Sequence, residues 1–177
     1  MVARTGYTGE RGFELYAPAA TSRRAHRALL DGGATPVGLG ARDTLRLEMG
    51  YALYGHELSV DVNPLEASLG WVLAWDTPFR GREALLEVKQ RGPARRLVGI
   101  RCTQKGIPRQ DHAVLAEGRR VGTVTSGNYS PTLECGIALA LTEATAALEP
   151  GATVEIDAVR RRIAGAIVKP PFIRREN

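Results

Sequence analysis

Three side chains in the first quarter of the chain, those of Tyr7, Glu14 and Arg42, have the chemistry to bind a flat polar ligand. Glu14 lies in the run FELY at 13–16, whose alternation of apolar and polar residues predicts a half-buried strand. A carboxylate on such a strand can accept two parallel N–H bonds from one edge of an arginine or a pterin ring. An ordinary exposed strand glutamate is the alternative, and the pattern leaves both interpretations open.

Arg42 falls in the first turn of a helix that we predict over 41–49. The helix dipole disfavours a cation in that turn by about 0.3–1 kcal/mol, which points to a partner outside the helix. Pairing with Glu48 or another carboxylate, and simple exposure, are the alternatives for Arg42. Asp43 stands three residues before Arg46 and is placed to offset its charge.

Tyr7 lies in a loop at 6–12 that is punctuated by three glycines, where a backbone can approach a ligand closely. Its ring can stack on a flat heterocycle, or it can fill the loop against the core. We expect the other large aromatic side chains near this region to pack in the core or between domains; they are Tyr51, Tyr54, Trp71 and Trp75.

The elements that must position these residues are read from hydrophobic periodicity. Apolar residues at helical spacing predict helices over about 21–30, 41–49 and 81–90, the first capped by Thr21 or Ser22. Short strands are predicted near 1–5, 13–16, 36–37 and 69–74. After Gly92-Pro93 the period changes to two, and six short strands follow; they lie at 97–100, 113–115, 121–124, 137–140, 154–156 and 163–168.

This change of period divides the chain into two predicted domains. Residues 1–91 form an α+β part with an antiparallel sheet and two or three helices, and residues 92–177 form a small all-β barrel-like domain. The length of 177 residues suffices for one large or two small domains with a real core.

Composition narrows the function classes. The net charge of +5 favours acidic partners, but only 6% of residues are aromatic and none alternates with the arginines, so we expect no nucleic-acid binding. No window approaches the roughly 20 apolar residues of a membrane span.

Cys102 and Cys135 are expected to be two reduced thiols of a cytoplasmic protein. Three scattered histidines predict no metal site, and TSG at 125–127 is no serine-nucleophile motif and has no histidine beside it.

Eight short motifs occur in one order along the chain. They are GYTGERGFE at 6–14, GLGARDTLRLEMG at 38–50, YGHEL at 54–58, PLEASLGW at 64–71, KGIPR at 105–109, GTVTSGNYSPTL at 122–133, GIALA at 136–140 and VKPPF at 168–172. Together they resemble the C-terminal half of the T-protein (aminomethyltransferase) of the glycine cleavage system.

The resemblance implies a three-domain enzyme around a folate cavity. It implies that the one-carbon unit of the aminomethyl-lipoyl group on the H-protein passes to tetrahydrofolate with release of ammonia. Glu14 matches the family glutamate that holds the pterin, Arg42 an arginine that contacts the folate, and Tyr7 a tyrosine beside the ring. The implied partners are the lipoylated H-protein and folate.

The resemblance also implies that the catalytic residue is missing. The family's catalytic aspartate lies in an N-terminal half that has no counterpart in this sequence. We therefore expect this chain to be a truncated or split portion that binds folate and has no catalytic residue of its own. Two alternatives stay open: the folate-binding portion of a dimethylglycine or sarcosine dehydrogenase-type enzyme, and a non-catalytic remnant.

Overall fold

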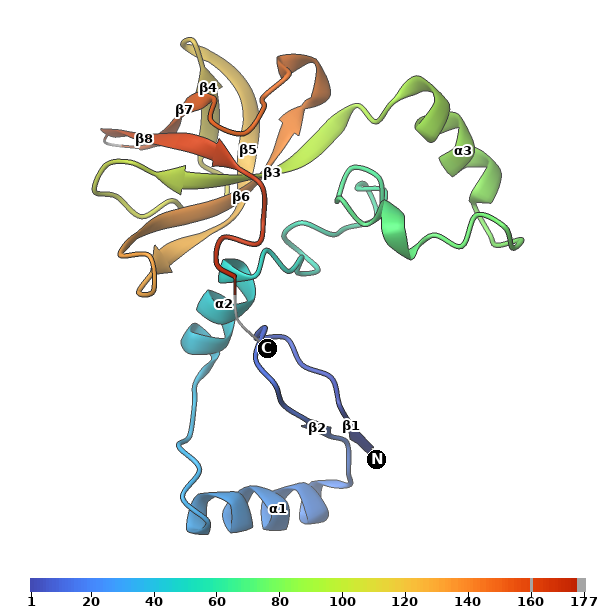
Figure 1. Cartoon of the computed structure of the whole chain (residues 1–177), viewed down its shortest axis with the longest axis vertical. Coiled ribbons are helices and arrows are strands. Elements are labelled where there is room, and N and C mark those ends of the chain that lie inside the picture. Colours follow the sequence, from blue (N-terminus) through green and yellow to red (C-terminus); the bar gives the residue numbers. More distant parts are fainter. Residues whose placement is uncertain (160, 175–177) are drawn as a thin grey trace.

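A closed six-stranded antiparallel barrel forms the C-terminal part of the computed structural model, which describes residues 1–159 and 161–174. Its spatial order is β3-β6-β5-β4-β7-β8, and β8 returns to pair with β3 (Figure 1). The strands are β3 (Arg95–Cys102), β4 (Ala113–Ala116), β5 (Arg119–Ser130), β6 (Cys135–Glu143), β7 (Thr153–Ala158) and β8 (Arg161–Val168).

Alternating side chains fill the barrel. Val98, Ile100 and Cys102, at every second position of β3, join an apolar core with Ile156 of β7 and Ile163 of β8. Burying each such side chain contributes about 1.5–3 kcal/mol. Strand β6 is buried on both faces, since its inner residues face this core and its outer residues lie under a helix.

That helix, α2 (Leu39–Glu48), packs against β5 and β6 and joins the barrel to the rest of the chain. Beyond α2, a two-stranded ribbon of β1 (Val2–Ala3) and β2 (Glu14–Leu15) and helix α1 (Ala19–Asp31) lie away from the barrel (Figure 1). Helix α1 buries none of its residues. A separate arm carries the 3-10 turn η1 (Gly70–Val72) and helix α3 (Arg82–Arg91); a second 3-10 turn, η2 (Ala144–Ala146), follows β6.

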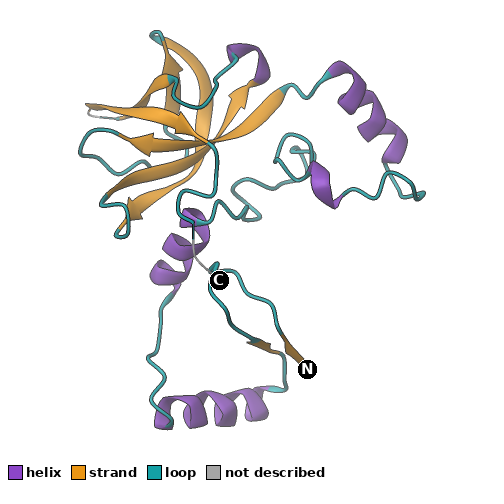
Figure 2. Cartoon of the chain, in the orientation of Figure 1, coloured by secondary structure: helices purple, strands orange, loops and turns teal. Residues whose placement is uncertain are grey.

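The predicted fold class is confirmed: three α-helices and an antiparallel ribbon precede an all-β barrel (Figure 2). Details differ. Helix α1 starts after Pro18 without a side-chain cap, and the Ser22 hydroxyl donates to the Ala17 carbonyl instead. The strand predicted at 69–74 is wrong, because this apolar run has no neighbouring strand to pair with and forms η1. Residues 36–37 likewise form no strand.

Candidate functional site

Helix α2 is fixed to the barrel at its C-terminal end. Leu47 is fully buried against Ile137 and Leu139 of β6. One residue on, the buried Glu48 carboxylate accepts the Ser130 hydroxyl at 2.5 Å, and its carbonyl accepts the Phe172 amide at 2.8 Å. The first turn of α2, which carries Arg42, therefore projects from an anchored base into an exposed position.

The structure brings Arg42 and Tyr7 together. The Arg42 guanidinium carbon lies 4.8 Å from the centre of the Tyr7 ring, within the range of a cation–π interaction. The other neighbours of Tyr7 are Tyr51, whose ring centre is 5.6 Å away, and the Ala52 carbonyl, which accepts the Tyr7 hydroxyl. Burial raises the pKa of Tyr7, an effect that the positive charge of Arg46 partly opposes. Glu48, the alternative partner considered for Arg42, is buried and accepts the Ser130 hydroxyl.

Glu14 stands apart from this pair. It lies on β2 opposite Ala3, and the Thr5 hydroxyl donates to its Oε2 atom. Within residues 1–159 and 161–174 the other carboxylate oxygen, Oε1, accepts no hydrogen bond, and no ion pair joins Glu14 to Arg42. The half-buried strand predicted here is more exposed than expected, since Phe13 and Leu15 on the apolar face are 71% and 47% exposed.

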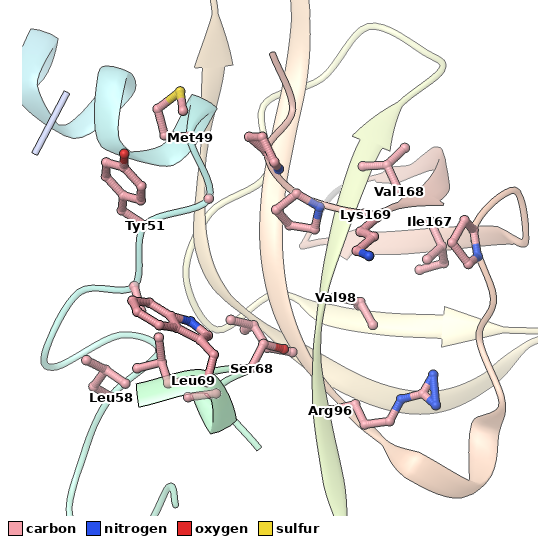
Figure 3. Close-up of a pocket in the computed structure, with 18 of the residues that line it drawn as sticks. Met49, Tyr51, Leu58, Ser68, Leu69, Arg96, Val98, Ile167, Val168 and Lys169 are labelled. Carbon is pink, nitrogen blue, oxygen red and sulfur yellow. The ribbon is translucent and has the colours of Figure 1, made fainter. Parts of the chain in front are cut away.

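A cavity of about 750 Å³ opens beside Tyr7, between the segment after α2 and the barrel wall formed by β3 and β8 (Figure 3). Tyr51 borders one side, and the cations Arg96 and Lys169 lie toward the barrel side. A second cavity of about 310 Å³ is lined by Thr5, the partner of Glu14, and again by Tyr51. Glu14 and Arg42 line neither cavity directly.

Sequence reasoning missed several residues of this cavity. Tyr51, Tyr54 and Trp71 were expected to pack in the core or between domains. They do not lie in the core, since Trp71 is 82% exposed and lines the cavity with Tyr51, while Tyr54 is 71% exposed. The sequence around Arg96 contains no motif that predicts a binding site. Its position beside the cavity follows from the closure of the barrel. Lys169 could have been found through the VKPPF motif at 168–172, which places a cation at the end of β8.

Ser126 and His56 lie next to each other, although no motif in the sequence predicts this contact. Ser126 Oγ lies 3.4 Å from His56 Nδ1, contrary to the expectation that no histidine stands beside it. The same Nδ1 lies 2.9 Å from the Thr125 carbonyl oxygen, which can only accept, so this nitrogen carries the proton. Ser126 also accepts a hydrogen bond from Arg46. A protonated Nδ1 cannot take the serine proton, and the pair is structural.

The thiols of Cys102 and Cys135 are both free. Cys102 belongs to the barrel interior and Cys135 packs with the cluster under α2, so they face opposite sides of the wall. Burial raises the pKa of Cys102 to about 11. The described residues hold no cluster of histidine, cysteine and carboxylate side chains suited to a metal ion. None of their helices combines the length and apolar character needed to cross a membrane.

Comparison with known proteins gives a consistent picture. Two family models match: the GCVT N-terminal domain over residues 1–77 and the glycine cleavage T-protein C-terminal barrel domain over residues 95–173. An aminomethyltransferase from Herpetosiphon aurantiacus is 50% identical, and one from Mycobacterium leprae is 47% identical; each match covers 97% of this chain and 48% of the relative.

Among solved structures, the glycine cleavage system aminomethyltransferase T from Bartonella henselae superposes with a TM-score of 0.89 at 34% identity. That match covers 97% of this chain and 49% of the other. The chain thus spans about half the length of the relatives it matches. On these grounds the chain belongs to the glycine cleavage T-protein, or aminomethyltransferase, family.

Proposed function

We propose that this chain supplies the folate-binding and barrel portions of an aminomethyltransferase of the glycine cleavage system. In this reaction the one-carbon unit of an aminomethyl-lipoyl group on the H-protein passes to tetrahydrofolate, and ammonia leaves. The observation that carries the proposal is the stacking of Arg42 on Tyr7 beside a cavity of about 750 Å³. A flat face, a cation and a concave apolar wall are what a folate requires.

Each predicted site residue has a distinct role in this proposal. Glu14 accepts N–H bonds from the edge of the pterin ring with the oxygen that Thr5 leaves available. Tyr7 presents its ring beside the pterin, and Arg42 contacts the folate from above that ring. Arg96 and Lys169 add positive charge at the barrel side of the cavity, which suits an acidic ligand.

The proposal extends to the partner, the compartment and the domain division. A lipoylated H-protein is the donor that the reaction needs, and the chain's net charge of +5 favours an acidic carrier. Two free thiols fit a reducing, cytoplasmic location. We place the boundary between the two domains at residues 91 and 92, just before β3 begins at Arg95.

Turnover is the direct test of this function. We expect the 177-residue chain to bind tetrahydrofolate without releasing ammonia from aminomethyl-lipoyl H-protein, because the family resemblance assigns the catalytic aspartate to the other half of the relatives. The assay measures tetrahydrofolate-dependent ammonia release with the chain alone and with that half supplied as a second polypeptide. Release that does not depend on tetrahydrofolate, or no release with both halves and proven folate binding, contradicts the proposal.

A further inference from the structure

A buried arginine links α2 to two other parts of the fold. Arg46 is 1% exposed, and its guanidinium donates to Asp43 at 2.7 Å, to Glu57 at 3.2 Å and to Ser126 at 2.9 Å. A fourth hydrogen bond of 3.3 Å reaches the Tyr51 carbonyl. One side chain therefore connects the first turns of α2, the barrel strand β5 and the segment that follows α2.

Glu57 completes this connection from the opposite side. It is fully buried, and its Oε1 atom accepts the Thr125 hydroxyl of β5 at 2.5 Å. Its Oε2 atom accepts both Arg46 and the Leu53 backbone amide, the latter at 3.0 Å. The carboxylate is thus bonded through both oxygens, as a buried charge requires.

The segment held by this pair is the one that fixes Tyr7. Arg46 bonds the Tyr51 carbonyl and Glu57 bonds the Leu53 amide, while the Tyr7 hydroxyl donates to the Ala52 carbonyl between them. The Tyr51 ring, carried by the same segment, also lies against Tyr7. A continuous path of hydrogen bonds therefore runs from β5 through Glu57 and Arg46 to the ring on which Arg42 stacks.

Stability alone does not account for a charged pair at this position. The cost of removing both charges from water offsets much of their attraction, and two apolar side chains of similar size would stabilise the fold about equally well. What the pair adds is a defined geometry for the 51–53 backbone. We propose that Glu57 and Arg46 are positioning residues, which set the Tyr7 ring and hence the Arg42 cation for folate binding. This inference rests on the proposed function for the ligand, and on geometry alone for the position of Tyr7.

The first test reads Tyr7 without any ligand. The chain has five tyrosines, so labelling with 3-fluorotyrosine gives five fluorine resonances, assigned by single Tyr-to-Phe variants. We expect Glu57→Gln to shift or broaden the signals of Tyr7 and Tyr51. The matched control is Glu66→Gln, which breaks another carboxylate–arginine pair: Glu66 is buried, Arg95 is partly exposed, and two 3.0 Å bonds join them. Among the described residues, no hydrogen bond joins Glu66 to segment 51–53. Unchanged signals in the Glu57 variant, or equal changes in both variants, overturn the proposal.

A milder pair of variants guards against loss of folding. Thr125→Val removes the hydroxyl that Glu57 accepts, whereas Thr125→Ser keeps it. We expect the valine variant to reproduce the fluorine shifts of Glu57→Gln in part and the serine variant to retain the wild-type spectrum. Identical spectra for the valine and serine variants contradict the path from β5 to Tyr7.

The second test titrates tetrahydrofolate into each variant. Glu57→Gln is expected to weaken tetrahydrofolate binding about five- to tenfold, which corresponds to the loss of about one hydrogen bond and its ring contact. Glu66→Gln is expected to weaken binding less than about twofold. Combining Glu57→Gln with Arg42→Gln should give less than the product of the single effects, since both act through one contact. Independent, multiplicative effects overturn the positioning role. Absence of binding by the wild-type chain instead refutes the proposed function, while the fluorine result still decides whether the pair positions Tyr7.

Discussion

The junction between α2 and the barrel offers a sharp quantitative test, because two leucines of one helix differ strongly in burial. Leu47 is fully buried against β6, and Leu39, at the start of the same helix, is 81% exposed. Truncating each to alanine removes the same atoms. Any difference between the two variants therefore measures what packing on the barrel contributes.

The magnitude follows from the surroundings of Leu47. Its neighbours Ile137 and Leu139 belong to a strand that is hydrogen-bonded on both sides in a closed barrel, so they cannot collapse into the space left by truncation. Buried leucine-to-alanine changes cost about 2–5 kcal/mol, and a rigid wall favours the upper half of that range. Leu39→Ala should change the free energy of unfolding by less than about 0.5 kcal/mol.

The assay is urea unfolding followed by tryptophan fluorescence and circular dichroism. With a slope of about 2 kcal/mol/M, Leu47→Ala should lower the unfolding midpoint by about 1.8–2.5 M, and Leu39→Ala should leave it almost unchanged. A difference between the two variants of less than about 1 kcal/mol would refute the view that the α2–barrel contact anchors Arg42.

Three further predictions concern stability and reactivity. A hydrogen bond from Arg95 lowers the pKa of Glu66 below its ordinary value, so this carboxylate contributes stability at neutral pH that is lost as the pH falls through the lowered pKa. Thermal melts from pH 7 to 3 should therefore show a flatter acid dependence in Glu66→Gln. Gly50 has a φ of +67° and its α-carbon faces a proline ring, so Gly50→Ala should cost more than about 1 kcal/mol in urea unfolding; a smaller cost contradicts the assigned geometry. Cys102, buried and with its pKa raised to about 11, should react with a thiol reagent at pH 7 much more slowly than Cys135, and equal labelling by mass spectrometry would disprove this.

The fold was largely predictable because its signals are local. Alternation in β3, β7 and β8 predicts one inward face, and the structure places those residues in the barrel core. Gly92 marks the end of α3, as expected for a glycine with a φ of +83°. The strand predicted at 69–74 was wrong because an apolar segment of that length becomes a strand only where a partner strand exists.

The site was predictable only in part. Tyr7 and Arg42 lie within recognisable motifs, and the structure brings their side chains into contact. The bonds from Arg46 to Glu57 and Ser126 span 11 and 80 residues, and no periodicity in the sequence announces such pairs. They depend on how α2 docks on a closed barrel, which is a property of the whole fold.

Titration of tetrahydrofolate into the wild-type chain and its Glu14→Ala variant, followed by calorimetry, tests the central claim most directly. We predict saturable binding to the wild type at one site, and at least tenfold weaker binding when the carboxylate on β2 is removed, since hydrogen bonds to a charged group are worth more than about 1.4 kcal/mol. Equal affinities for the two proteins, or no saturable binding by the folded wild-type chain, would contradict it.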